Sequence, residues 1–167
     1  MPHSDPHVVH DKPGRIAMMP RPARNVRLDD DLARLRSVHG VDVLVCALPD
    51  DELELLGIPD EGDAVRRAGI RFEHFPIGDH DVPEFWSYHA LTARLAADVT
   101  AGAYVVAHCW AGIGRSALIA GGILIQLGMP AQQAVDQLVE GRGLPCPETP
   151  AQHRILLRLA ETLAAAR

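Results

Sequence analysis

One segment of the sequence combines a nucleophile, a planar cation and two glycines within nine residues. It spans His108 to Ser116 and reads HCWAGIGRS. Cys109 can attack an electrophile as a thiolate, and Arg115 presents a fork of N–H donors that matches two oxygens of a phosphoryl group. Gly112 and Gly114 allow a tight loop and a close approach of the backbone to a ligand. These residue types at this spacing predict a phosphate-binding loop that carries a cysteine nucleophile.

The segments on either side of the loop indicate how it is positioned. Ala103–Ala107 is expected to be a buried strand, and a helix is expected from about Arg115 to Leu127. Successive amides in a strand-to-helix loop converge on an anion, and the positive end of the helix points to the same place. That field also favours the thiolate of Cys109, so the nucleophile needs no dedicated base. Ser116 can donate its hydroxyl hydrogen to the sulfur, and His108 is expected to orient the loop through backbone hydrogen bonds.

In this order and context, the loop resembles the Cys-x5-Arg-Ser/Thr signature of the protein tyrosine phosphatase superfamily. The resemblance implies a two-step reaction, in which a cysteinyl-phosphate forms and water then hydrolyses it, without a metal or another cofactor. It implies that Cys109, Arg115 and Ser116 are catalytic. It also implies that the remaining loop residues bind the substrate, namely His108, Trp110, Ala111, Gly112, Ile113 and Gly114.

A phosphomonoester leaving group needs a proton, so a carboxylic acid should face this loop. The segment Phe75–Pro83 reads FPIGDHDVP. It resembles the general-acid loop of the compact dual-specificity branch, especially of kinase-associated-phosphatase-like members. The resemblance assigns Asp79 as the acid that later activates water, with Asp81 as its competitor. The alternative is that both carboxylates only cap a helix or a loop. The Trp-Pro-Asp triplet of the larger tyrosine-specific enzymes is absent, which favours the smaller branch.

Two further residues take a role from the same resemblance. Some compact members carry a cysteine in the strand equivalent to Val43–Leu48, and we hypothesise that Cys46 forms a reversible disulfide with Cys109 that prevents over-oxidation. The alternative is that Cys46 is a small residue of the core. Gln152 follows a turn where some relatives place a glutamine near the hydrolytic water. The alternative is an ordinary residue in the first turn of a helix.

The rest of the sequence alternates apolar β-branched runs with helical patterns. This alternation predicts one α/β domain over residues 13–167, with a mostly parallel central sheet of four to five strands flanked by helices. Ligands bind at the carboxyl ends of the strands in such a sheet. Residues 1–12 contain three histidines, two prolines and little apolar surface, and are expected to form a flexible tail. The other strands are expected at Arg15–Met19, Val41–Ala47 and Ile70–Phe75, and the other helices at Asp29–Val38, Asp50–Leu56, Glu61–Ala68, Pro83–Val99, Pro130–Glu140 and Pro150–Ala166.

Composition narrows the class of protein and of partner. The chain has 167 residues with a formal charge of -6, which argues against a broad electrostatic grip on nucleic acid or an anionic membrane. Three cysteines are too few for a disulfide framework, and no apolar run approaches the length of a membrane span, so we expect a cytoplasmic protein. No basic residue lies between Cys109 and Arg115, where relatives that act on highly phosphorylated inositides often carry one. The expected partner is therefore a protein or peptide phosphorylated on tyrosine, and also on serine or threonine.

Two other classes of protein share parts of this pattern. A catalytically inactive phosphoprotein-binding module usually lacks the nucleophile, the arginine or the acid, and all three are present here. A thiol redox enzyme of the arsenate-reductase or sulfurtransferase type can contain a Cys-x5-Arg loop. Small arsenate-reductase-like folds carry it near the N-terminus, whereas Cys109 follows about two thirds of this chain.

Overall fold

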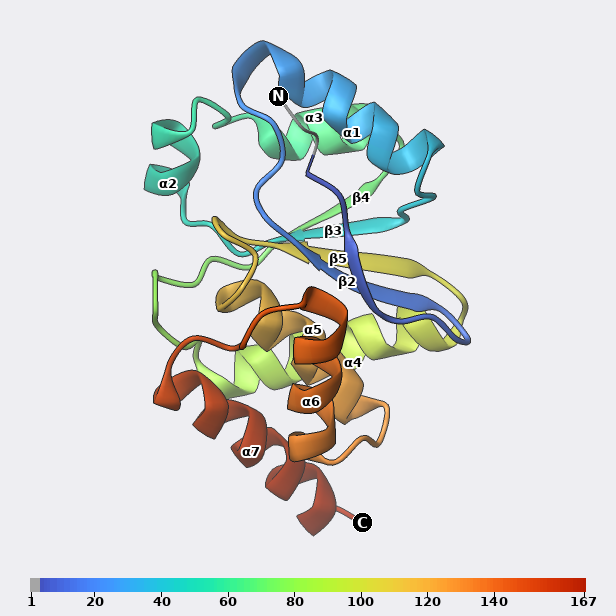
Figure 1. Ribbon diagram of the computed structural model, residues 1–167, viewed down its shortest axis with the longest axis vertical. Helices are drawn as coiled ribbons and strands as arrows, with labels where there is room; N and C mark the ends of the chain where they lie inside the picture. The colour runs from blue at the N-terminus through green and yellow to red at the C-terminus, as the bar shows by residue number, and fades with distance from the viewer. Residues whose placement is uncertain (1–3) are drawn as a thin grey trace.

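A five-stranded sheet in the order β1-β2-β5-β3-β4 runs through the middle of the computed structural model, which describes residues 4–167 (Figure 1). Four neighbouring strands are parallel, and β1 pairs with β2 in the antiparallel direction. The strands are β1 (His7–His10), β2 (Arg15–Met19), β3 (Val43–Cys46), β4 (Arg71–His74) and β5 (Tyr104–His108). The expected α/β class with a mostly parallel sheet is confirmed.

Helices cover both faces of this sheet. In Figure 1 the N-terminal helices α1 and α3 lie above the sheet, and the helices from α4 to α7 lie below it. On the lower side α4 and α5 contact the parallel strands, α6 contacts both β1 and α5, and α7 packs against α5. The helices are α1 (Leu28–Ser37), α2 (Asp50–Leu55), α3 (Glu61–Arg67), α4 (Phe85–Thr100), α5 (Arg115–Gln126), α6 (Ala131–Arg142) and α7 (Pro150–Ala165), with a short 3-10 turn at Asn25–Arg27.

Helix α5 is the centre of the lower layer. Every residue from Arg115 to Ile125 is buried, because strands lie on one side of the helix and α4, α6 and α7 surround the rest. Such a helix must be apolar all round, which explains the run ALIAGGILI. The helix that follows the phosphate-binding loop is therefore held firmly, and its first turn has a fixed position relative to the sheet.

The register of the sheet brings four strand ends to one edge. Met19 and Cys46 both pair with His108, and Cys46 also pairs with His74. These are the last residues of the four parallel strands. The loops that follow them, including the one that carries Cys109, therefore meet at the edge where an α/β sheet binds its ligands.

Two expectations about the chain are corrected. Residues 7–10 form β1 rather than part of a flexible tail, because Val9 is buried and the strand pairs with β2; residues 1–3, which include His3, lie outside the described residues. Helix α4 begins at Phe85 rather than near Pro83, because the carboxylate of Glu84 caps it and accepts from two backbone N–H groups at 3.0 and 2.7 Å. Within residues 4–167, no helix has the length and apolar character needed to cross a bilayer.

Candidate active site

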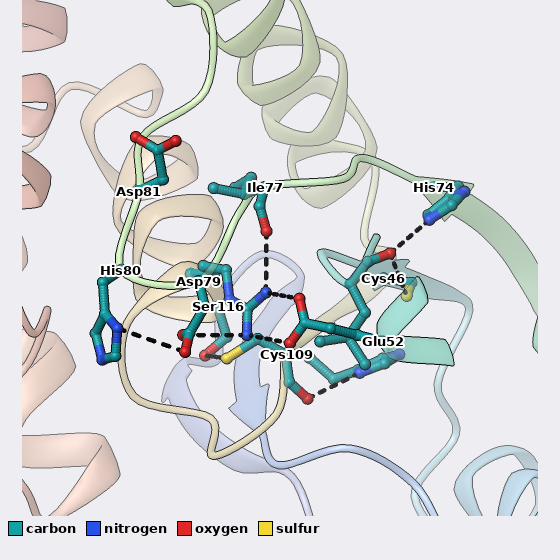
Figure 2. A network of polar contacts seen from close by, with 12 residues as sticks. Cys46, Glu52, His74, Ile77, Asp79, His80, Asp81, Cys109 and Ser116 are labelled. Carbon is teal, nitrogen blue, oxygen red and sulfur yellow. Dashed lines mark hydrogen bonds and ion pairs between the residues drawn. The ribbon is translucent and has the colours of Figure 1, made fainter. Parts of the chain in front are cut away.

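The loop from His108 to Ser116 connects β5 to α5 at the carboxyl edge of the sheet, as expected. The four side chains that carry its chemistry are 0–3% exposed, namely His108, Cys109, Arg115 and Ser116. Sγ of Cys109 and Oγ of Ser116 are 3.4 Å apart, which is hydrogen-bond contact for sulfur (Figure 2). The hydroxyl therefore lies where it can donate to a thiolate.

Residues outside the loop hold its backbone in place by donating hydrogen bonds to its carbonyl groups. Arg142 at the end of α6 donates from Nε to the carbonyl oxygen of Gly112 at 2.8 Å and from a terminal nitrogen to that of Ala111 at 3.2 Å. The backbone N–H of Arg21 donates to the carbonyl of Trp110 at 3.1 Å. A peptide group points its N–H and C=O in opposite directions, so carbonyls fixed outward direct the amides inward.

Gly112 is required by the close approach of another strand end. Its φ is +72°, and a Cβ there would lie 2.5 Å from backbone atoms of Met19 and Pro20. Any other residue would therefore push the loop away from the end of β2. Trp110 is half-buried beside this contact, and the guanidinium of Arg24 lies 5.8 Å from the centre of its ring.

Arg115 is oriented by a carboxylate that the sequence pattern did not identify. Its two terminal nitrogens donate to the two oxygens of Glu52 at 2.6 and 3.0 Å, and one of them also donates to the carbonyl of Ile77 at 2.9 Å (Figure 2). Burial lowers the pKa of Arg115, but the hydrogen bonds and the charge of Glu52 outweigh burial and raise it. One edge of the guanidinium is therefore occupied by Glu52, and the edge that carries Nε is the one that can bind a phosphoryl oxygen.

A signal for Glu52 existed in the sequence. The residue lies in the first turn of α2, directly after the carboxyl end of β3, and so at the same edge as the phosphate-binding loop. However, an acidic run such as residues 50–52 is also typical of a helix start. This common role explains the run by itself, so the sequence did not single out Glu52 as a partner of Arg115. A carboxylate that follows a buried parallel strand is a candidate site residue for the same reason as the loop itself.

The two candidate acids lie in different environments. Oδ1 of Asp79 is 3.4 Å from a terminal nitrogen of Arg115, and the side chain is 60% exposed. Oδ1 of Asp81 accepts from the backbone N–H of Val82 at 2.8 Å, within its own turn. Figure 2 shows Asp81 turned away from Cys109, whereas Asp79 lies beside the loop. The fold therefore brings Asp79 to the site and uses Asp81 to shape the turn.

His80 connects this turn to the start of α7. Its φ is +60°, and its two ring nitrogens lie 3.4 Å from carboxylate oxygens of Asp79 and Glu148. The carboxylate of Glu148 also lies over Gly114, where a Cβ would be 2.5 Å from its Oε1. The turn that carries Asp79, His80 and Asp81, called the acid turn below, is therefore linked by these side chains to the start of α7 and to the phosphate-binding loop.

Gln152 is buried and links the same elements by hydrogen bonds. It forms a capping box with Thr149 at the start of α7, and its side-chain oxygen accepts from the backbone N–H of Glu148 at 3.0 Å. Its side-chain nitrogen donates to the carbonyl of Asp81 at 3.2 Å. The structure thus gives Gln152 the role of a first-turn helix residue and adds a tether to the acid turn; contact with a hydrolytic water stays a prediction.

Cys46 lies beside a buried ion pair. Its sulfur, a carboxylate oxygen of Glu61 and a ring nitrogen of His108 are all buried and lie within 4.8 Å of one another. These atoms are close enough to share a cation, but Nε2 of His108 is already paired with Glu61 at 2.5 Å, so within residues 4–167 the three side chains form a buried polar cluster rather than an open ligand set. Burial raises the pKa of the Cys46 thiol. A disulfide with Cys109 stays a prediction.

Comparison of sequences places the chain among proteins of known type. Residues 17–135, more than half of the chain, match the family model described as cyclin-dependent kinase inhibitor 3 (CDKN3). The cyclin-dependent kinase inhibitor 3 proteins of Homo sapiens and Rattus norvegicus are 30% and 29% identical to this chain over 144 residues. Each match covers 85% of this chain and 66% of the relative, so the chain spans just under two thirds of their length.

Comparison of structures gives the same fold. Kinase-associated phosphatase (KAP), in a form whose catalytic-site cysteine was replaced by serine, superposes with a TM-score of 0.83 at 23% identity, over 98% of this chain and 96% of that one. Tk-PTP in its active form superposes with a TM-score of 0.76 at 24% identity, over 93% and 96% of the two chains.

Proposed function

The chain belongs to the cyclin-dependent kinase inhibitor 3 family, and from this premise we propose that it is a cysteine-dependent protein phosphatase. Its substrates are proteins or peptides phosphorylated on tyrosine, and also on serine or threonine. The observation that carries the proposal is the convergence of three groups at one edge of the sheet: the sulfur of Cys109, the guanidinium of Arg115 and the carboxylate of Asp79. Kinase-associated phosphatase, which has the same fold, also has a cysteine in its catalytic site, and this agrees with the role given to Cys109.

The first step transfers the phosphoryl group to the protein. The thiolate of Cys109 attacks phosphorus, a P–S bond forms, and the bond from phosphorus to the leaving oxygen breaks. Protonated Asp79 gives its proton to that oxygen. Arg115 and the inward amides of the loop bind the phosphoryl oxygens and bind them more strongly as the group flattens in the transition state.

The second step regenerates the thiolate. Water attacks phosphorus, the carboxylate of Asp79 takes a proton from that water, and the P–S bond breaks as inorganic phosphate forms. The hydroxyl of Ser116, 3.4 Å from the sulfur, donates to the departing thiolate. Asp79 ends the cycle protonated, so protons balance and the residues of the site need no further reactant besides water.

The substrate class follows from the charge of the site. The five residues between Cys109 and Arg115 are uncharged, and Glu52, Asp79 and Glu148 lie around the loop. Carboxylates at these places repel a ligand with several phosphates, which argues for a substrate with one phosphomonoester. The three cysteines are free thiols in the structure, and we propose a reducing, cytoplasmic setting in which Cys109 stays reactive.

The proposal is tested with the purified chain and p-nitrophenyl phosphate in the presence of EDTA. We expect turnover without added metal, inhibition by vanadate, and a loss of more than about 10³-fold in Cys109→Ser. Binding of a phosphopeptide without turnover would instead identify a phosphoprotein-binding module. Reduction of arsenate with consumption of thiol, and no phosphatase activity, would identify a redox enzyme.

A further inference from the structure

A fully buried ion pair lies directly under the phosphate-binding loop. Glu61 is the first residue of α3, His108 is the last residue of β5, and both side chains are 0% exposed. Nε2 of His108 contacts Oε1 of Glu61 at 2.5 Å, and Nδ1 of the same ring contacts the carbonyl oxygen of Cys109 at 3.3 Å. The imidazole therefore bridges a carboxylate on one side and the backbone of the nucleophile on the other.

The partners of the ring decide its charge. A carboxylate and a carbonyl oxygen can only accept a hydrogen bond, so a ring that faces one at each nitrogen must donate from both. An imidazole with two N–H donors is an imidazolium. Burial lowers the pKa of His108, but the charge of Glu61 and the hydrogen bond to it outweigh burial and hold the pKa well above its usual range.

Other groups near the pair do not cancel this charge. Among the described residues, the thiol of Cys46 on β3 and the ring of His74 on β4 are the remaining titratable groups that act on the pair. Burial keeps the thiol neutral, since it raises the pKa of Cys46. For Glu61, burial alone would raise the pKa, but the charge of His108 outweighs burial and lowers it. The pair is therefore a dipole whose positive end points toward the loop.

We propose that Glu61 is a positioning residue: it keeps His108 protonated beneath the loop, and the imidazolium stabilises the thiolate of Cys109. This inference rests on the proposed function, because it concerns the same nucleophile. The ring fixes the carbonyl of Cys109 and brings a positive charge to that residue, while the matching negative charge of Glu61 lies farther away on α3. The net field favours negative charge on the sulfur.

The variant Glu61→Gln separates charge from shape. A glutamine amide can donate to Nε2 of a neutral ring, so Nδ1–H still donates to the carbonyl of Cys109 and the loop keeps its geometry. The measurement is the pH dependence of Cys109 alkylation by iodoacetamide, read by mass spectrometry of the Cys109 peptide. We expect the midpoint to move upward by about half to one pH unit, and the acid limb of kcat/KM to move with it. The matched control is Asp63→Asn, an exposed carboxylate on the same helix, which should leave the midpoint unchanged.

The outcomes separate this inference from the proposed function. A wild-type midpoint near that of free cysteine would overturn the phosphatase mechanism itself. A low wild-type midpoint that is unchanged in Glu61→Gln would overturn only the role of Glu61. If Glu61→Gln does not fold, ¹⁵N NMR of histidine-labelled wild-type protein decides. We expect both ring nitrogens of His108 to carry protons at pH 8, and a neutral tautomer there would refute the inference.

Discussion

The two halves of the candidate site differ in how they are held. The phosphate-binding loop carries the side chains that we propose to be catalytic, which are 0–3% exposed, and Arg142, Arg21 and the end of β2 fix its backbone. The acid turn carries Asp79 and His80, each 60% exposed, whose contacts with neighbouring charges are 3.4 Å long. The half proposed to bind the phosphoryl group is therefore preformed, whereas the half proposed to deliver the proton is held by few and long contacts.

The difference has a chemical reason. A thiolate and an anion site depend on charges and dipoles that must already be in place, because their reorganisation would cost part of the stabilisation. A general acid must approach the leaving oxygen only after the substrate is bound, and contacts of this kind often tighten at that stage. We expect substitutions in the two halves to change different kinetic constants.

Among substitutions that leave the nucleophile Cys109 in place, the largest effect should come from the acid turn. In Asp79→Asn we expect kcat for a phosphotyrosine peptide to fall by about 10²-fold, with little change in the inhibition constant for vanadate, because the phosphate-binding loop is untouched. The matched control is Asp81→Asn, which keeps an oxygen that can accept from the N–H of Val82 and should lose far less turnover. A larger loss in Asp81→Asn would reverse the assignment of the acid.

A smaller effect, and of another kind, is expected in the preformed half. Glu52→Gln replaces a bidentate ion pair with a weaker hydrogen bond to Arg115, so the guanidinium is less well oriented. We expect KM and the inhibition constant for phosphate to rise by about 10-fold, or about 1.4 kcal/mol, with a smaller change in kcat.

Glu54→Gln serves as the control for this experiment, because it changes an exposed carboxylate on the same helix α2. Equal kinetic constants in Glu52→Gln and in the control would show that Arg115 is positioned without Glu52. A fall confined to kcat would instead place Glu52 with the proton-delivering half.

The smallest effect is expected where the two halves meet. Thr149→Ala removes the side chain that caps α7 and pairs with Gln152, whose amide tethers the acid turn. We expect the free energy of unfolding in urea to fall by about 1 kcal/mol, with turnover reduced less than about three-fold. Thr149→Ser should restore the stability. A loss of turnover as large as that of Asp79→Asn would mean that the cap, rather than the turn itself, positions the acid.

The sequence by itself determined the phosphate-binding loop and most of the helices and strands. The residues of the phosphate-binding loop are contiguous, and their chemistry follows from residue type, glycine content and the strand-to-helix context. Within residues 4–167, the four parallel strands and the seven α-helices follow from hydrophobic periodicity, with bounds that differ by at most two residues. The antiparallel strand β1 was not predicted from the sequence. It is short, two of its four residues are histidines, and only Val9 is buried among residues 7–10, so it has no clear apolar pattern.

Only the tertiary structure decided which residues from other elements hold the site residues in place. Glu52, Glu61 and Arg142 lie 63, 47 and 30 residues away from the loop residues that they contact. In the sequence each is a charged residue near a helix end, where exposure to solvent is the ordinary expectation. Packing of α2, α3 and α6 around one sheet edge turns them into partners of Arg115, His108 and the loop carbonyls. Distance in space, which the chain order does not contain, decides which charges are paired.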